Sequence, residues 1–352
     1  QVNKKALDDA RAKVATLLGA QPNEIYFTSC GTEADNWALK GMAEALKDKG
    51  NHLITTNIEH HAILHTCQYL EKHGFEVTYL EVDEHGLITP EQVEKAIKKE
   101  TILISIMYAN NEIGTIMPVA EIGKIAHEHG VVFHTDAVQA VGQLSIDVKR
   151  DHIDLLSLSG HKFYGPKGVG ALYIRRGLKI PSLLQGGGQE RGRRAGTENV
   201  PGIVGLATAL ELAYQDLERK TEKIQSLRDY MIEQIYQRIP HCRLNGHRTQ
   251  RLPNNVNFSF QFVEGESLLL LLDLEGIAAS SGSACTSGSL DPSHVLLALG
   301  LPHEKAHGSI RFTFGEDNTK EEVDQVLGKL PAFVERMRAM SPLYEEFLRQ
   351  NS

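Results

Sequence analysis

The sequence has few cysteines, no long hydrophobic run and no excess of positive charge. Its four cysteines form no C-x-x-C pair, which argues against a zinc site or a disulfide framework and fits a reducing compartment. There is no run of 18 apolar residues and no signal peptide, so we expect no membrane partner and a cytoplasmic location. The net charge of −8 also argues against nucleic acid as a main partner.

The composition is that of a globular protein with ample core material. Apolar residues make up 41% of the chain and charged residues 23%. A chain of 352 residues exceeds the size at which one core keeps growing, so we expect a large domain over 1–212 and a smaller one over 213–352. Apolar strand patterns alternate with helical ones in the first part, which predicts an α/β fold with a parallel sheet.

The most informative stretch runs from Val131 to Gly168. Apolar runs at 131–133 and 153–158 show no strict alternation, which is typical of buried parallel strands. His134, Asp136 and Gln139 follow the first run, and Ser159, His161 and Lys162 follow the second. The carboxyl ends of parallel strands form the edge where α/β proteins bind ligands.

An aspartate and a lysine on neighbouring strand ends suit pyridoxal phosphate. A lysine holds this cofactor as a Schiff base, and a carboxylate keeps its ring nitrogen protonated. We expect apolar strand residues, and His161 if charged, to favour the neutral amine of Lys162. The alternative is an ion pair between Asp136 and a solvated Lys162.

Two earlier strand-to-helix turns are also candidate ligand sites. Gly31 and Thr32 open a helix predicted over 33–47, whose first N–H groups favour an anion such as a phosphate; the alternative is a helix N-cap. His60 precedes a helix predicted over 62–73 and is suited to stack on a ring and to carry protons. A hydrogen-bonded loop histidine is the alternative. His61 and His65 lack a third ligand, so we expect no metal site.

Two further segments have polar character at predicted loops. Asn110 and Asn111 follow an apolar strand predicted over 102–108, and they suit hydrogen bonds to a ring oxygen or a carboxylate, or a simple turn. The glycine- and arginine-rich segment 186–197 is predicted to be irregular. It suits anion contact or a subunit interface.

The second part of the chain contains one cysteine in a small-residue loop. Residues 280–289 include Cys285 and no large apolar side chain, so we expect an exposed, mobile segment. A thiol on such a segment suits a sulfur nucleophile; a chance cysteine in a polar loop is the alternative. Arg311 lies on a predicted strand among apolar neighbours, where it suits a substrate carboxylate or a structural ion pair.

Taken together, these motifs resemble the NifS/IscS-type cysteine desulfurases of the fold-type I pyridoxal-phosphate superfamily. The matching stretches occur in order over nearly the whole chain: FTSCGTE, IEHHA, ANNEIGT, HTDAVQAVG, SLSGHKFYGPKG, GGGQERGRRAGT, SSGSACTSGS and GSIRFTFG. Such proteins usually begin with a segment containing a D-N-A-T-T-like motif, so we expect a preceding segment that this sequence does not include.

The resemblance implies a fold, a cofactor and a set of site residues. The fold is a large domain with a mainly parallel seven-stranded sheet flanked by helices, plus a smaller α+β domain with the mobile Cys285 loop. Lys162, Cys285 and His60 would be catalytic. Pyridoxal phosphate would be bound by Gly31, Thr32, His60, Asn111, Asp136, Gln139, Ser159, His161 and Lys162, with Thr197 from the other subunit of a homodimer. Asn111 and Arg311 would bind the substrate carboxylate.

The implied reaction converts L-cysteine to L-alanine and leaves the sulfur on Cys285 as a persulfide. An iron–sulfur scaffold protein or a thiolation enzyme would then accept it. Two rivals remain open at this point. An aminotransferase or selenocysteine lyase would keep Lys162 but need no Cys285. A non-catalytic scaffold would merely hand sulfur on or regulate assembly, and it would need no bound cofactor.

Overall fold

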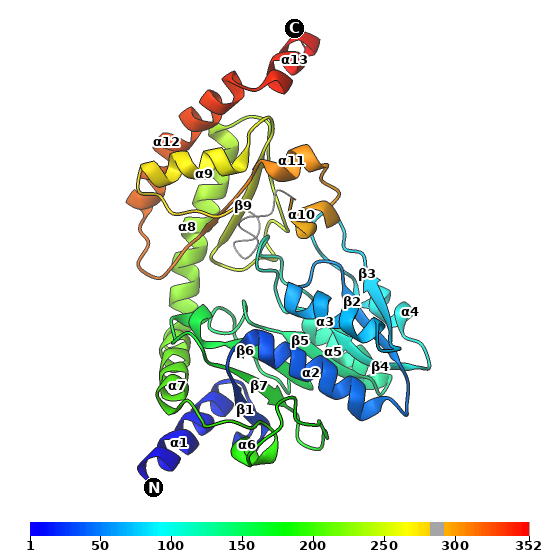
Figure 1. The fold of residues 1–352 in the computed structure, drawn as a ribbon. Coiled ribbons are helices and arrows are strands. Elements are labelled where there is room, and N and C mark those ends of the chain that lie inside the picture. The colour runs from blue at the N-terminus through cyan, green and yellow to red at the C-terminus, as the bar shows by residue number, and fades with distance from the viewer. Residues whose placement is uncertain (282–291, 352) are drawn as a thin grey trace. The chain divides into compact units, whose positions relative to one another are not determined.

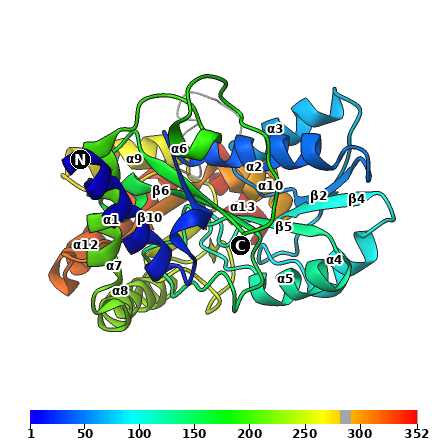
Figure 2. The same ribbon diagram turned by 90° about the horizontal axis from the view of Figure 1, so that it is seen from below.

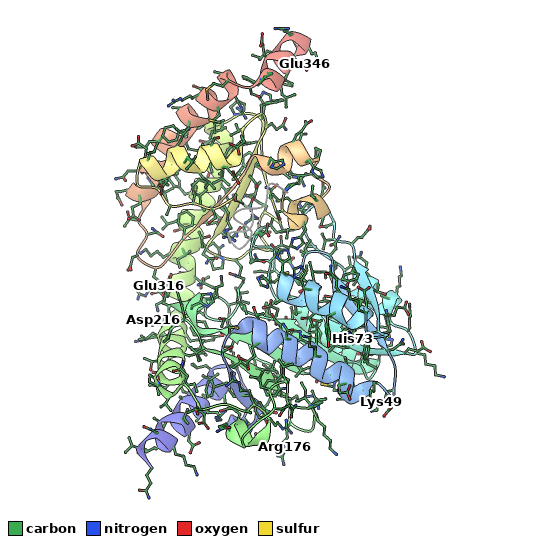
Figure 3. The ribbon with its side chains drawn as sticks, in the orientation of Figure 1. Lys49, His73, Arg176, Asp216, Glu316 and Glu346 are labelled. Atoms are coloured by element: carbon green, nitrogen blue, oxygen red, sulfur yellow. The ribbon has the colours of Figure 1, made fainter. Side chains whose placement is uncertain are left out.

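The computed structural model describes residues 1–281 and 292–351, which form two compact units. The first unit comprises Gln1–Glu81, Ile88–Asn110 and Met117–Leu217, and the second comprises Val82–Leu87, Asn111–Ile116 and Glu218–Ser352. The expected boundary at residue 212 falls inside helix α7 (Val200–Tyr214). The backbone leaves helical geometry at Asp216, labelled in Figure 3, where φ is 53°. The division into domains at 1–212 and 213–352 stays a prediction.

The first unit is built on a seven-stranded sheet. Its strands are β1 (Ile25–Thr28), β2 (His52–Thr56), β3 (Glu76–Leu80), β4 (Thr101–Ser105), β5 (Val132–Asp136), β6 (Leu155–Ser159) and β7 (Gly170–Ile174). Their order is β1-β7-β6-β5-β4-β2-β3, and only the pairings of β7 with β1 and with β6 are antiparallel. The predicted α/β fold with a mainly parallel sheet is therefore confirmed.

Helices cover both faces of this sheet. Figure 2 shows α2 (Gly31–Leu46) and α3 (His61–Glu71) on one face, and α4 (Pro90–Ala96) and α5 (Val119–Glu128) on the other. Lys49 and His73, labelled in Figure 3, lie just beyond the ends of α2 and α3. The remaining elements of the unit are α1 (Val2–Leu17), α6 (Gln189–Gly192), α7 and the 3-10 turns η1 (Pro22–Glu24) and η2 (Gly160–Phe163).

Burial on both faces explains the apolar strand sequences. Every residue of β1, β2, β4, β6 and β7 is buried, as expected of strands with helices on both sides. On the α2 side, Trp37, Leu39 and Met42 pack in one cluster with Leu53 of β2 and Leu172 of β7. This core fixes the start of α2 and the strand ends beside it.

The second unit is built on the three-stranded antiparallel sheet β10-β9-β8, visible beside α9 and α12 in Figure 1. Its elements are α8 (Leu217–Arg238), β8 (Cys242–Leu244), β9 (Asn255–Phe260), α9 (Gly265–Leu274), α10 (His294–Ala298), α11 (His303–His307), β10 (Ser309–Thr313), α12 (Lys320–Ala339) and α13 (Pro342–Asn351). Val256, Phe258 and Phe260 of β9 form its core with side chains of α8, α9 and α12. Within residues 1–281 and 292–351, every helix is too short or too polar to span a bilayer.

Candidate active site

Asp136 and Lys162 lie at the ends of two adjacent parallel strands. Asp136 is the last residue of β5, and it pairs in register with Ser157 of β6. Strand β6 ends at Ser159, and the turn η2 directly after it contains His161 and Lys162. The structure therefore brings the two residues to one edge of the sheet. They are close enough for the charge of Lys162 to lower the pKa of Asp136.

The carboxyl group of Asp136 is buried and sensitive to its surroundings. Its side chain is almost covered, and the backbone N–H of Val138 donates to its Oδ1 at 3.0 Å. Burial raises the pKa to about 6, while the Val138 N–H, the charge of Lys162 and a hydrogen bond with Asp35 oppose that rise. At pH 7 Asp136 is therefore mainly ionised, which is the form that pairs with a protonated ring nitrogen.

The surroundings of Lys162 differ from the sequence prediction. We expected apolar strand residues to surround its amine, but the side chains of His161 and Lys162 are both exposed. The reason is that the strand stops at Ser159 and η2 turns the chain out of the sheet, with Tyr164 in a left-handed conformation at φ 66°. Burial and the charge of Lys162 lower the pKa of His161, which favours the neutral ring over the charged form that would repel the lysine.

Polar groups from three segments lie close together at the start of α2. Helix α2 follows Cys30, whose side chain makes no cap hydrogen bond. A Cβ atom at Gly31 would lie 2.7 Å from Val138 Cγ2 and 3.5 Å from the Cβ of Ser159, so only glycine allows this close approach. Ser159 Oγ and His161 Nδ1 are 2.9 Å apart. The first N–H groups of α2 therefore lie beside two side-chain donors, an arrangement that fits a phosphate group.

The arginine-rich segment is anchored to the same helix. Arg194 donates to both carboxylate oxygens of Glu33, at 2.8 and 3.0 Å. Burial opposes ionisation of Glu33, but hydrogen bonds from Arg194 and Ser29 hold its pKa below the ordinary value. The segment was predicted to be irregular, yet it contains the short α6, in which Glu190 and Arg191 have positive φ angles. Thr197, three residues after Arg194, is exposed.

His60 is both a helix cap and a half-buried edge residue. It precedes α3, and its Nδ1 accepts a hydrogen bond from the backbone N–H of Ala62 at 3.1 Å. In the neutral ring the proton therefore lies on Nε2. The predicted hydrogen-bonded loop histidine is thus present, and the bond fixes the tautomer that a proton carrier needs. Gln139, also half-buried, follows β5 at the same edge.

Asn111 and Arg311 lie together in the second unit. Arg311 on β10 donates from Nη1 to the backbone oxygen of Asn111 at 2.6 Å. The preceding Asn110 instead belongs to the first unit, where its side chain is buried and donates to Ile58 O at 2.9 Å. Of the two asparagines, Asn110 therefore stabilises the turn, and Asn111 lies beside the predicted carboxylate-binding arginine.

The sequence analysis missed two asparagines that hold the backbone directly after Asn111. The side chains of Asn255 and Asn257 on β9 both donate to the backbone oxygen of Glu112, at 3.0 and 2.8 Å. The available signal was the alternation of β9 itself, because Asn255, Asn257 and Ser259 share the face opposite Val256, Phe258 and Phe260. Buried asparagines on a strand face need hydrogen-bond partners, which here are supplied by the residue after Asn111.

Cys285 lies outside the described residues, but the chain on either side of it is placed. Ser280 and Arg311 exchange backbone hydrogen bonds of 3.0 and 2.6 Å. On the other side, the Ser293 hydroxyl donates to the carboxylate of Glu112 and also caps α10. The described residues that flank the segment containing Cys285 therefore lie beside Arg311 and Glu112.

Comparisons with known proteins agree with this geometry. A family model described as aminotransferase class-V matches residues 1–326. "Cysteine desulfurase IscS" of Clostridium botulinum is 60% identical over 348 residues, which cover 98% of this chain and 88% of that protein.

Solved structures with the same fold are also similar in sequence. A structure titled "NIFS-LIKE PROTEIN" is 40% identical with a TM-score of 0.88, covering 95% of this chain and 88% of the other. A structure titled "SspA in complex with cysteine" is also 40% identical, with a TM-score of 0.77 and coverage of 90% and 89%. The similarity therefore extends through both units rather than to the sheet alone.

Proposed function

The chain belongs to the aminotransferase class-V family and, within it, to the cysteine desulfurases, and from this premise we propose how its residues convert L-cysteine to L-alanine. Enzymes of this family depend on pyridoxal phosphate. The observation that supports the proposal most strongly is the placement of Asp136 and Lys162 on adjacent strand ends, beside the uncapped start of α2.

The residues at the sheet edge fit the cofactor. Lys162 would bind it through Nζ, the Asp136 carboxylate would pair with its ring nitrogen, and His60 would stack on the ring. The remaining contacts would come from residues around them: Gln139 and Asn111 for the ring oxygen, and Gly31, Thr32, Ser159 and His161 for the phosphate. When bound, pyridoxal phosphate supplies an electron sink for the carbon next to the substrate amine.

Substrate binding and proton transfer follow from the same residues. The guanidinium of Arg311 would bind the carboxylate of L-cysteine in a bidentate manner, helped by Asn111. Lys162 Nζ would remove the proton from the α-carbon. His60, with its proton on Nε2, would move a proton at the edge of the site.

Cys285 would accept the sulfur. Its thiolate attacks the sulfur of the substrate, so that an S–S bond forms as the bond between sulfur and the β-carbon breaks. The β-carbon receives a proton and the α-carbon regains the one that Lys162 removed, which gives L-alanine and leaves Cys285 as a persulfide. The position of the described residues that flank its segment, beside Arg311 and Glu112, supports this role.

The persulfide would be passed to an iron–sulfur scaffold or another acceptor protein. We also propose a homodimer in which the exposed Thr197 reaches the cofactor phosphate of the other subunit. Within each chain, residues 1–212 would hold the cofactor and residues 213–352 would carry the Cys285 segment. The cytoplasmic location is likewise a proposal, which cell fractionation tests.

The test separates cofactor binding from sulfur transfer. Cys285→Ala should lose nearly all alanine formation from L-cysteine and keep the visible absorbance band of the bound cofactor. Lys162→Ala should lose that band. Cys242→Ala, which changes a half-buried thiol that donates to Ile239 O, is the matched control and should leave both signals unchanged.

Two results would contradict the proposal. Alanine formation that survives in Cys285→Ala would favour an aminotransferase or lyase that needs no protein thiol. Absence of a visible band in the wild-type protein after addition of pyridoxal phosphate would favour a non-catalytic scaffold.

A further inference from the structure

A chain of buried polar side chains crosses the sheet next to Asp136. Ser105 Oγ of β4 lies 2.8 Å from His134 Nδ1 on β5, and His134 Nε2 lies 2.9 Å from Ser157 Oγ on β6. Ser157 also hydrogen-bonds to Asp35, which lies on α2. Asp35 in turn hydrogen-bonds to Asp136. None of the roles proposed above uses Ser105, His134, Ser157 or Asp35.

The hydrogen bonds of this chain can all point toward Asp136. Burial lowers the pKa of His134 to about 3, so its ring is neutral and has one donor and one acceptor nitrogen. If Ser105 donates to Nδ1, then Nε2–H donates to Ser157, and the Ser157 hydroxyl is left to donate to Asp35. Each O–H and N–H group of these three side chains then donates one hydrogen bond. The next donor in the series is the Asp35 carboxyl, which must carry a proton to fill that role.

The surroundings of Asp35 favour its protonated form. Its side chain is 1% exposed, and within the part of the chain that the structure describes, its Oδ1 has no hydrogen-bond partner. The nearest ring nitrogen, His134 Nε2, is 3.7 Å from Oδ1 and belongs to a neutral imidazole. Burial, which is the largest effect, and the neighbouring charge of Asp136 both oppose a negative charge there. An ionised carboxylate would lack both a cation and a full set of donors.

We propose that Asp35 is a protonated positioning residue that donates a hydrogen bond to the Asp136 carboxylate. It rests on the proposed function, in which Asp136 pairs with the cofactor ring nitrogen. The donated bond stabilises the anion of Asp136, which burial alone would push toward the neutral acid. Two adjacent buried carboxyls thereby hold a single proton and a single negative charge, and the charge is on the residue that faces the ligand edge.

The first experiment measures the proton directly. Infrared difference spectra of the full-length protein at pH 7, wild type minus Asp35→Asn, should contain the carbonyl stretch of a protonated carboxylic acid. Glu59→Gln is the matched control, because Glu59 is a second buried acid in contact with Thr56 and Met107. The Glu59→Gln protein should keep the Asp35 band, and the acid band that it loses should be a separate one, because burial raises the pKa of Glu59 to about 8. If removal of Asp35 takes away only carboxylate bands, Asp35 is ionised and the proposal is wrong.

The second experiment measures the effect on the holoenzyme. In Asp35→Ala, loss of the donor should weaken the affinity for pyridoxal phosphate by about tenfold. The acid-side midpoint of the visible absorbance titration should also rise by about one pH unit, because Asp136 then protonates more easily. Asp35→Asn keeps a donor at the same place, so both quantities should stay within about threefold and a few tenths of a unit of wild type.

The outcomes of these experiments are distinct. Equal losses in Asp35→Asn and Asp35→Ala would contradict a donor role, as would an unchanged affinity and midpoint in Asp35→Ala. The infrared measurement involves no cofactor, so it can succeed or fail independently of the proposed enzymatic function.

Discussion

Arg11 with Glu190, and Asp35 with Asp136, are two pairs of ionisable side chains buried in the same unit, but their charges combine differently. Both carboxylate oxygens of Glu190 accept from Arg11 at 2.7 Å, and one of them also accepts from Phe27 N. That pair is complementary in charge, and both oxygens of its carboxylate accept hydrogen bonds. Asp35 and Asp136 are instead two acids that compete for one negative charge, and Asp35 Oδ1 has no hydrogen-bond partner among the described residues.

The Arg11–Glu190 pair has a structural role, whereas Asp35 and Asp136 lie at the candidate active site. Glu190 belongs to the arginine-rich segment and Arg11 to α1, so their pairing fixes a long-range contact between segments 179 residues apart. Complementary charges suit this purpose because the contact need not change. Of the two acids near Lys162, the ionised Asp136 lies at the end of its strand, where a carboxylate attracts a cationic group of a ligand.

Breaking the complementary pair should have the largest effect on stability. Glu190→Ala leaves the guanidinium of Arg11 buried without its carboxylate, which should lower the free energy of unfolding by about 3–5 kcal/mol. Urea unfolding followed by circular dichroism measures this change. Glu211→Ala, which removes the partner of Lys13 in an exposed pair, is the control and should cost less than about 1 kcal/mol. Equal losses in the two variants would show that burial does not distinguish the pairs.

Replacing the buried acid Glu59 should instead raise the free energy of unfolding at high pH. Burial raises the pKa of Glu59 to about 8 from a model-peptide value of 4.5. The folded state therefore binds a proton that the unfolded state releases, so this group's contribution to stability is complete below pH 4.5 and is lost as the pH rises to about 8.

Glu59→Gln keeps the shape of the side chain and cannot ionise. It should therefore be more stable than wild type by roughly 2–4 kcal/mol at pH 8.5, and should differ little at pH 4.5. Urea unfolding at the two pH values tests this prediction. A stability difference that is the same at both pH values would mean that Glu59 does not change its protonation on unfolding.

A partly exposed pair should give the smallest effect. The side chains of Arg194 and Glu33 are 18% and 11% exposed, and they form two parallel hydrogen bonds. Arg194→Lys keeps the charge and loses the bidentate geometry, so it should cost about 1 kcal/mol of stability. Chemical unfolding of this variant, compared with Glu190→Ala, measures how far the strength of a pair follows its burial. A loss as large as that of Glu190→Ala would break the correlation.

Much of the fold follows from local pattern, and the exceptions have physical causes. The strand pattern predicted an end at Phe133, because His134 is polar, but β5 continues to Asp136. Both nitrogens of His134 are satisfied by Ser105 and Ser157 on the neighbouring strands, which allows a polar residue to stay inside the sheet. Sequence periodicity does not show partners that lie 23 and 29 residues away.

The residue types of the candidate site could be predicted from the sequence. The residues that position them, and the exposure of their side chains, could be predicted less well. Asp136, Lys162 and Gly31 were placed by strand ends and a helix start, which are local signals. Asp35 was missed because a polar residue on a predicted helix is ordinarily exposed, and only the packing of α2 on the sheet buries it. The exposure of Lys162 was also unpredictable, since it depends on how η2 leaves β6.

Mass spectrometry of the peptide that contains Cys285 tests the central claim most directly. After brief incubation of the holoenzyme with L-cysteine, that peptide should gain the mass of one sulfur atom in the wild type and remain unmodified in Lys162→Ala. Sulfur found on Cys30 or Cys242 in place of Cys285, or on Cys285 equally in the Lys162→Ala protein, would contradict the account.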